Sequence, residues 1–394
     1  MKNNIKAARR VAGITFLIAI IFCGLVLAQH PDGEMAFSHI GTRFSKGIPK
    51  EEGGTTGYDG QFAYFIARYG AEAVPYIDGP TFRYQRIFYP VLARALSLGQ
   101  ADLVPWALIG INIIALSAGA GMIAYLLGQM RASPYLALLY AVWVGNLFAL
   151  RLNLTELLCF ALALGAIIAY QRERYRWVIL LLMLSTLTKE LGLIFAGGLA
   201  LHALIIRRKW AWGFLMGGVP FITLMMWWEI LRLWLEGSPT NYPAAKGFTL
   251  IPLEGLWTAL SKPEDFAQET RTVQFILLVT FLAIPAIVLL GLALRQLWQN
   301  RQQLRHPDDD HLNGGGRNLW SLSVMFTAIG FLFIMPGVSW QDPAAAYRVG
   351  APLIVAGILF MGNFYPRRLK WLVIYWLPSC LIILLIPGLW SGGA

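Results

Sequence analysis

This sequence has few charged residues. Only 13% of its 394 residues are Asp, Glu, Lys or Arg, while 57% are hydrophobic and the mean hydropathy is +0.58. The charged fraction is about half that of soluble domains, which excludes a soluble enzyme. The net charge of +11 does not indicate nucleic acid as a partner, because no polar segment carries a basic stripe interleaved with aromatic residues.

Cysteines and familiar catalytic motifs are also scarce. Cys23, Cys159 and Cys380 each lie in an apolar run without a CxxC spacing, so neither a disulfide framework nor a zinc knuckle is expected. The sequence has no HExxH, Walker A or GxSxG motif. Without a nucleotide-binding loop, ATP or a sugar nucleotide is not favoured as substrate. The run 306–311 (HPDDDH) resembles a metal cluster, but its glycine-rich surroundings favour a flexible connector.

Apolar runs occupy most of the chain and predict an all-α polytopic membrane protein with about eleven transmembrane helices. The stretch 177–206 fits either two short helices that meet at Lys189 or one long tilted helix. Basic clusters flank it on both sides, which requires an even number of crossings and therefore favours the hairpin. The predicted spans are 11–28, 103–127, 134–150, 152–170, 177–188, 191–206, 210–235, 273–297, 319–336, 351–363 and 371–390.

The distribution of basic residues predicts the orientation. With the N-terminus in the cytoplasm, the inner side holds 18 basic and four acidic residues, or +14, and the outer side holds 14 basic and 17 acidic residues, or −3. The chain 1–394 is then a single transmembrane domain whose C-terminus is extracytoplasmic. It carries a first extracytoplasmic loop at 29–102, a second outer loop at 236–272 and a cytoplasmic connector at 298–318. No internal repeat stands out, which disfavours a secondary transporter.

The first outer loop contains the run Gly57-Tyr58-Asp59-Gly60-Gln61-Phe62. The apolar residues that follow recur at helical spacing, which predicts a short helix lying in the membrane interface. Asp59 would stand at the N-terminal end of this helix, between glycines that allow a ligand to approach the backbone. Two interpretations remain open, since Asp59 either caps the helix or faces a ligand. The apolar stripe consists of Phe62, Phe65, Ile66 and Tyr69.

Two arginines follow in the run 82–90 (FRYQRIFYP). Arg83 and Arg86 are three residues apart, so one helical turn would place both guanidinium groups on one face. Paired guanidinium groups near a membrane suit a phosphate. Contact with lipid headgroups, or pairing with Glu72 and Asp78, is the alternative.

Several charged residues fall near the outer ends of predicted spans, where charge is costly and usually lines a polar cavity. They predict such a cavity, open at the outer leaflet and covered by the first loop. The alternative is that some of them are only structural pairs, namely Arg151 with Glu156 and Glu229 with Arg232. The set is Arg151, Glu156, Lys189, Glu190, Glu229 and Arg232.

These features resemble the GT-C superfamily of polytopic membrane glycosyltransferases. The runs 57–67 and 84–90 resemble a bacterial branch associated with cell-surface glycopolymer formation, and 187–193 (LTKELGL) is similar to a hairpin tip near the active site of mannosyltransferase relatives. The resemblance implies an inverting transfer of a hexose or pentose from a polyprenyl-phosphate sugar to an extracytoplasmic glycan, lipid or protein acceptor. It also implies residence in a bacterial inner or plasma membrane.

The resemblance further implies roles for individual residues. Asp59 would be the general base. The candidates for binding the donor phosphate are Arg83, Arg86, Lys189 and Arg348. The candidates for binding sugar or acceptor are Tyr58, Gln61, Gln85, Glu156 and Glu190.

No cofactor is expected, but a single Asp replaces the paired acids of several GT-C branches, which leaves the use of a divalent metal open. Two rival functions remain: a transporter or flippase of lipid-linked saccharides, and a non-catalytic subunit of an envelope assembly.

Overall fold

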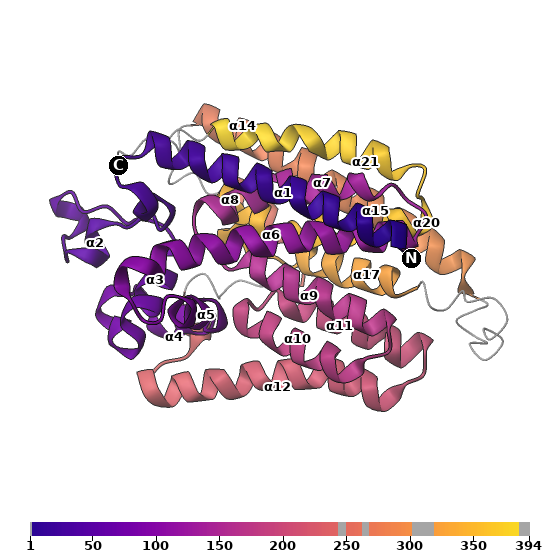
Figure 1. Ribbon diagram of the computed structural model, residues 1–394, viewed down its shortest axis with the longest axis horizontal. Helices are drawn as coiled ribbons and strands as arrows, with labels where there is room; N and C mark the ends of the chain where they lie inside the picture. The colour runs from indigo at the N-terminus through magenta and orange to yellow at the C-terminus, as the bar shows by residue number, and fades with distance from the viewer. Residues whose placement is uncertain (1, 243–249, 262–267, 302–318, 386–394) are drawn as a thin grey trace.

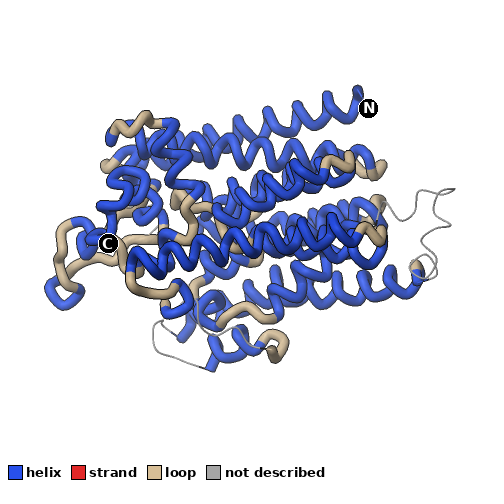
Figure 2. The backbone as a smooth tube through the Cα atoms, turned by 90° about the horizontal axis from the view of Figure 1, so that it is seen from below, coloured by secondary structure: helices blue, strands red, loops and turns tan. Residues whose placement is uncertain are grey.

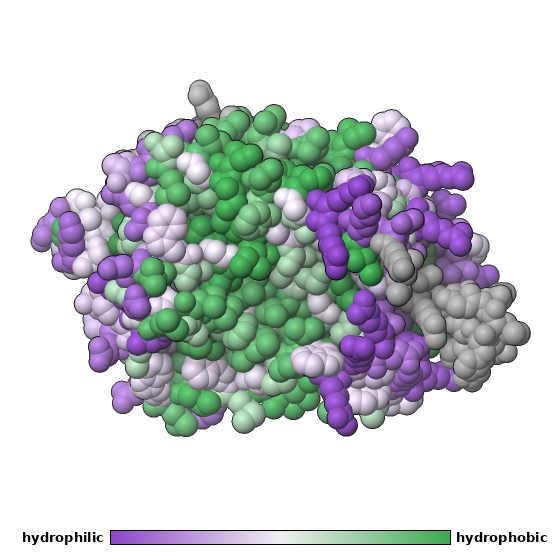
Figure 3. Space-filling model, viewed as in Figure 1, coloured by the Kyte–Doolittle hydropathy of each residue, from purple (hydrophilic) through white to green (hydrophobic). Residues whose placement is uncertain are grey.

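The computed structural model describes residues 2–242, 250–261, 268–301 and 319–385. Every regular element in these ranges is a helix, so the predicted all-α fold is confirmed. The long helices lie side by side as one bundle, seen from two directions in Figures 1 and 2. Side chains of low hydropathy gather at the two ends of the bundle, and a broad hydrophobic band covers the surface between them (Figure 3).

Five helical segments are long and apolar enough to cross a membrane. They are Asn3–Gln29, Ala101–Gln129, Trp210–Leu235, Thr272–Gln299 and Pro343–Phe364. The elements that form them are α1 (Lys2–Gln29), α6 (Val104–Gln129), α12 (Trp210–Leu235), α14 (Gln268–Leu278) with α15 (Ile284–Gln299), and α19 (Pro343–Val349) with α20 (Ala351–Phe364). A π-helical turn, Val279–Ala283, joins α14 to α15.

A sixth span results if the bent pair at Pro134–Val142 and Val144–Arg151 is counted as one. The two parts, η5 (Pro134–Ala137) with α7 (Leu138–Val142) and then α8 (Val144–Arg151), meet at an angle of 53°. The predicted span 134–150 is therefore a broken helix.

Five further apolar helices have 10–17 residues, fewer than the roughly 20 needed to span a bilayer at right angles. Each coincides with a predicted span, but the predicted number of eleven crossings is not confirmed. In the stretch 177–206 the structure has two helices rather than one tilted helix, and they are separated at Lys189. The five are formed by α9 (Glu156–Gln171), α10 (Tyr175–Thr188), α11 (Gly192–Leu201) with a π-turn (His202–Ile206), α17 (Trp320–Phe333), and α21 (Leu369–Trp376) with a 3-10 segment (Leu377–Leu385).

Helices α1 and α6 pack along one another, with α6 largely buried and α1 on the outside of the bundle. Small residues permit this approach, since a Cβ atom added to Gly121 of α6 would lie 3.0 Å from the Cβ of Ala12. Close packing through small residues is typical of helices in lipid, where burial of apolar side chains gives little driving force.

The first loop folds into short helices at the end of the bundle opposite the N-terminus (Figure 1). The predicted helix at its centre is α3 (Gly60–Tyr69). Its apolar stripe does not lie on a membrane surface: Phe62, Phe65 and Ile66 are buried in the protein core, where α3 packs against α5 and α6. The prediction that the stripe is helical is confirmed, and the prediction that it faces the membrane interface is wrong. The other loop elements are η1 (Gly33–Phe37), α2 (Thr42–Ser45), η2 (Lys50–Glu52), η3 (Gly70–Tyr76), α4 (Pro80–Tyr84), α5 (Phe88–Leu96) and η4 (Ala101–Leu103).

The remaining described elements follow α12 and α17. They are η7 (Pro239–Asn241), α13 (Glu254–Ser261) and α18 (Gly337–Gln341). The candidate metal cluster at 306–311 and most of the connector 298–318 lie outside the described residues.

Candidate functional site

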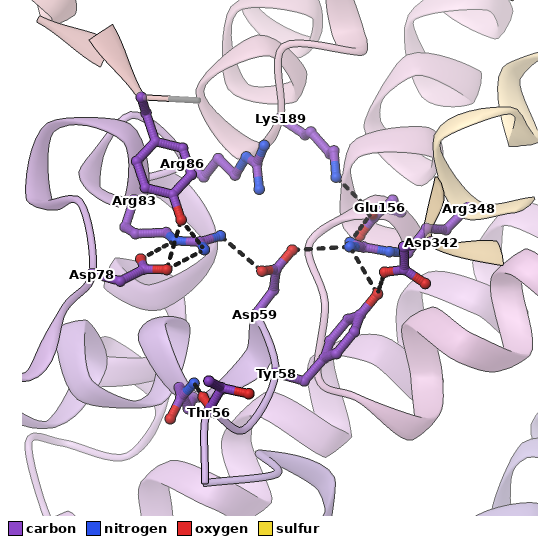
Figure 4. Close-up of polar contacts among 12 residues, drawn as sticks. Thr56, Tyr58, Asp59, Asp78, Arg83, Arg86, Glu156, Lys189, Asp342 and Arg348 are labelled. Carbon is purple, nitrogen blue, oxygen red and sulfur yellow. Dashed lines mark hydrogen bonds and ion pairs between the residues drawn. The ribbon is translucent and has the colours of Figure 1, made fainter. Parts of the chain in front are cut away.

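Asp59 lies at the centre of a cluster of charged side chains. It occupies the N-cap position of α3, but its carboxylate makes no capping hydrogen bond. Instead Oδ1 accepts from Arg83 Nη1 at 2.8 Å and Oδ2 accepts from Arg348 Nη2 at 2.9 Å (Figure 4). The side chain is 27% exposed, whereas the two arginines are 8% and 5% exposed. The capping interpretation of Asp59 is therefore wrong.

Arg83 is held on three sides. Its Nε and Nη2 donate to the two oxygens of Asp78 at 2.7 and 2.9 Å, and its guanidinium lies 4.2 Å above the ring of Phe62. Tyr242, from the segment that follows α12, donates to Asp78 at 2.7 Å and stacks on Phe82. These contacts fix the guanidinium in one orientation, with Nη1 toward Asp59.

Arg348 reaches Asp59 from the other side, at the C-terminal end of α19. Its Nη1 donates to Glu156 Oε1 at 2.9 Å and its Nη2 to the hydroxyl of Tyr58 at 3.2 Å. Tyr58 in turn donates to Asp342, whose other oxygen caps α19 by accepting from a backbone N–H. The same Glu156 oxygen also accepts from the ammonium group of Lys189, and both of these side chains are almost fully buried.

Arg86 forms a separate ion pair at the edge of this group. Its Nη2 and Nε donate to the two oxygens of Glu190 at 2.8 and 3.2 Å. Glu190 stands at the tip between α10 and α11, and a third of its side chain is exposed. Its side chain is more exposed than those of Asp59, Asp78 and Glu156.

The cluster as a whole pairs every cation with an acid. Buried charges are expensive unless they are paired and hydrogen-bonded, and here the pairs share atoms so that one carboxylate serves two cations. Burial opposes ionisation of Asp59, but the guanidinium groups of Arg83 and Arg348 outweigh it and hold the pKa of that carboxyl well below its usual range. The cations are Arg83, Arg86, Lys189 and Arg348, and the acids are Asp59, Asp78, Glu156, Glu190 and Asp342.

A narrow pocket opens between these side chains. Its volume of about 30 Å³ is room for water but far below the roughly 300 Å³ of a small-molecule site. A larger ligand would therefore require the pocket to widen. Its walls are formed by Asp59, Phe62, Ala63, Ile66, Arg83, Arg86, Pro90, Asn153, Leu154, Thr155, Glu156 and Arg348.

Two predicted binding residues lie elsewhere. The amide of Gln61 is committed to the backbone, because its oxygen accepts from Gly41 N–H at 3.0 Å and its nitrogen donates to Thr56 C=O at 2.8 Å. This geometry favours a structural role in holding the first loop. Gln85 is buried and does not form part of the pocket wall.

Three of the six charged residues expected around a polar cavity are not in this cluster. Arg151 is buried beside the first loop, where it donates to Ala36 C=O at 2.6 Å and lies 2.9 Å from the Nε2 of His30. Glu229 and Arg232 pair with each other on an exposed face of α12. The idea of one cavity lined by all six residues is wrong, and the structural-pair interpretation holds for Glu229 and Arg232.

Tyr242, Asp342 and Asn153 also belong to the site and were not expected from the sequence. Asp342 had a readable signal, since Asp followed by Pro is typical of a helix start. Tyr242 and Asn153 had none, because their place in the site depends on contacts between segments far apart in the chain.

Among the described residues, no three His, Cys, Asp or Glu side chains come together as metal ligands. The use of a divalent metal therefore stays open, as the sequence left it.

No protein-family model matches the chain, and no curated protein matches its sequence.

Proposed function

We propose that this protein is an integral membrane glycosyltransferase of the GT-C type. It would transfer a sugar with inversion from a polyprenyl-phosphate donor to an extracytoplasmic acceptor, in the formation of a cell-surface glycan or glycopolymer. The N-terminus would be cytoplasmic and the site extracytoplasmic, in keeping with the excess of basic residues on the inner loops.

The observation that carries the proposal is the position of Asp59. A single carboxylate stands between two guanidinium groups in the wall of a pocket, and a third guanidinium, that of Arg86, lines the same pocket. A phosphodiester and a nucleophilic hydroxyl need this combination, because the cations stabilise the phosphate and the carboxylate accepts a proton. The hydrophobic band beside the site suits a lipid-linked donor.

In the proposed reaction Asp59 and the arginines have separate roles. The acceptor hydroxyl attacks the anomeric carbon, a new C–O bond forms on the opposite face, and the bond to the phosphate oxygen breaks. The electron pair leaves with the polyprenyl phosphate, whose charge Arg83, Arg86 and Arg348 offset, and the hydroxyl proton passes to Asp59.

Binding of the donor would also prepare the base. In the structure both arginines are turned to Asp59, which makes it a weak proton acceptor. A phosphate bound beside Arg83 and Arg348 offsets their positive charge, which weakens their stabilisation of the carboxylate and raises its proton affinity. The acceptor is then activated only when the donor is in place.

Substitution of Asp59 tests the proposal. We expect Asp59→Asn to reduce transfer from a polyprenyl-phosphate sugar by at least about 100-fold, because the amide accepts no proton. The assay is release of polyprenyl phosphate by the purified, folded variant, with a panel of labelled donors. Retained turnover would contradict the role of Asp59. A wild-type protein that moves the donor across vesicles without cleaving it would indicate the rival transporter.

A further inference from the structure

The turn between α8 and α9 forms one wall of the pocket. Asn153, Leu154, Thr155 and Glu156 all line it. Asn153 is fully buried and has a φ of 49°, in the left-handed region that residues other than glycine rarely adopt. Asn tolerates this conformation better than most residues, and such backbone often marks a functional position.

Two oxygen atoms of this wall lack hydrogen-bond donors among the described residues. They are Oδ1 of Asn153 and Oε2 of Glu156. The other amide atom of Asn153 has only a long contact of 3.5 Å to Ser38 Oγ. Buried polar atoms are nearly always paired, with protein or with ordered water. Two unpaired acceptors on residues that line one pocket are therefore groups that a ligand with donors would satisfy in place of water.

The chemistry of the two groups restricts that ligand. Glu156 already pairs with Lys189 and Arg348 through Oε1, so its free oxygen suits a neutral donor better than a further cation. The amide of Asn153 can accept and donate at once. Hydroxyl groups do both, and two of them on neighbouring ring carbons would match two neighbouring side chains.

We infer that Asn153 and Glu156 form a subsite for adjacent hydroxyl groups of a sugar ring. This inference rests on the proposed function and specifies how the transferred sugar is recognised. It gives Asn153 a role in selecting the sugar, and it predicts that sugars lacking either of the two hydroxyls are poor ligands. Arg83 and Arg86 hold the phosphate, while the turn at 153–156 holds the ring.

Binding measurements separate the ring from the phosphate. The probes are farnesyl phosphate and the farnesyl-phosphoryl derivatives of glucose, galactose, mannose and arabinose, titrated calorimetrically into the detergent-purified protein. For the sugar lipid that binds best, we expect Asn153→Gly to weaken affinity by about tenfold or more and to leave farnesyl phosphate affinity within about twofold. Glycine keeps the positive φ, so the turn itself is preserved.

Asn146 supplies the matched control. It is a buried asparagine with an open Oδ1 that does not line the pocket, so Asn146→Ala should change neither affinity. A second arm uses the wild-type protein with monodeoxy versions of the best ligand, which avoids any effect on folding. Loss of affinity at two adjacent ring positions, and abolition of the loss at one of them in Asn153→Gly, would support the subsite.

Three results would overturn the inference. They are unchanged affinity of Asn153→Gly for the sugar lipid, equal tolerance of every deoxy position, and no sugar lipid that binds better than farnesyl phosphate. Failure of the proposed function is a different outcome, in which the sugar lipids bind and the deoxy pattern holds but no polyprenyl phosphate is released.

Discussion

Two glutamates that stand in similar stretches of sequence lie in opposite environments in the folded protein. Glu156 and Glu229 each lie in an apolar helix, with an arginine close by in the sequence, Arg151 and Arg232 respectively. Glu156 is 1% exposed and shares its oxygen between Lys189 and Arg348, whereas Glu229 is 54% exposed and has only Arg232, three residues along the same helix. Glu156 lines the pocket, and Glu229 lies on an exposed face of α12.

The contrast shows which charged residues in apolar segments are candidates for function. The partner of Glu229 is local, and a local pair forms on any helix. The partners of Glu156 come from other segments, 33 and 192 residues away in sequence. Only the folded chain can bring them together and exclude water, so long-range pairing, rather than charge alone, identifies the site.

The largest expected effect comes from the contact that joins the first loop to the pocket wall. A Cβ atom at Gly60 would lie 1.9 Å from the carbonyl oxygen of Leu152. Gly60→Ala should therefore push Asp59 away from Glu156, lower the melting temperature in detergent and abolish transfer. We expect a stability loss of roughly 1–3 kcal/mol from the forced displacement.

Gly24→Ala is its matched control. Gly24 has open space around it within helix α1, so an added methyl group should be tolerated or slightly stabilising. Equal melting temperatures for the two variants would show that the Gly60 contact does not matter.

A smaller effect is expected at the edge of the cluster. Arg86→Ala should weaken affinity for farnesyl phosphate by about tenfold to 100-fold, since charge-assisted hydrogen bonds contribute about 1.5–3 kcal/mol. Calorimetric titration measures this, and Arg232→Ala serves as the control for loss of a cation. Unchanged phosphate affinity in Arg86→Ala would remove Arg86 from the phosphate site.

The smallest effect is expected from the exposed pair. Replacing both partners, Glu229→Gln with Arg232→Gln, should leave transfer within about twofold of wild type, because exposed ion pairs contribute little. The same donor-cleavage assay tests this. A loss comparable with that of Asp59→Asn would place α12 in the site and overturn the comparison between the two groups.

Much of the architecture could be predicted from the sequence, because apolar runs and helix periodicity are local properties. The helix at Gly60–Tyr69 follows from such a pattern, whereas the break at Lys189 follows from the basic clusters on both sides of 177–206. The 53° bend between α7 and α8 does not, since no proline stands at the junction and only packing of the folded bundle determines it.

The site was predictable in part for the same reason. Asp59 and the pair Arg83 and Arg86 stand in short runs that can be recognised locally, and the structure brings all three to one pocket. Asn153 and Tyr242 reach the site through tertiary contacts alone. Arg151 was wrongly expected to line the cavity for the same reason. The position of a residue near the end of a predicted span does not determine which way its side chain points.

The contact between Gly60 and Leu152 also decides which part of the site must move. It keeps Asp59, the proposed base, close to the turn that carries Asn153 and Glu156. Under the proposed function, the pocket of about 30 Å³ has to widen to admit a glycosyl phosphate. The tight backbone contact would then place the displacement in the opposite wall, formed by α4 and α5 with Arg83, Arg86 and Pro90, so that entry of the donor would be a sideways opening of that wall rather than a lifting of the first loop.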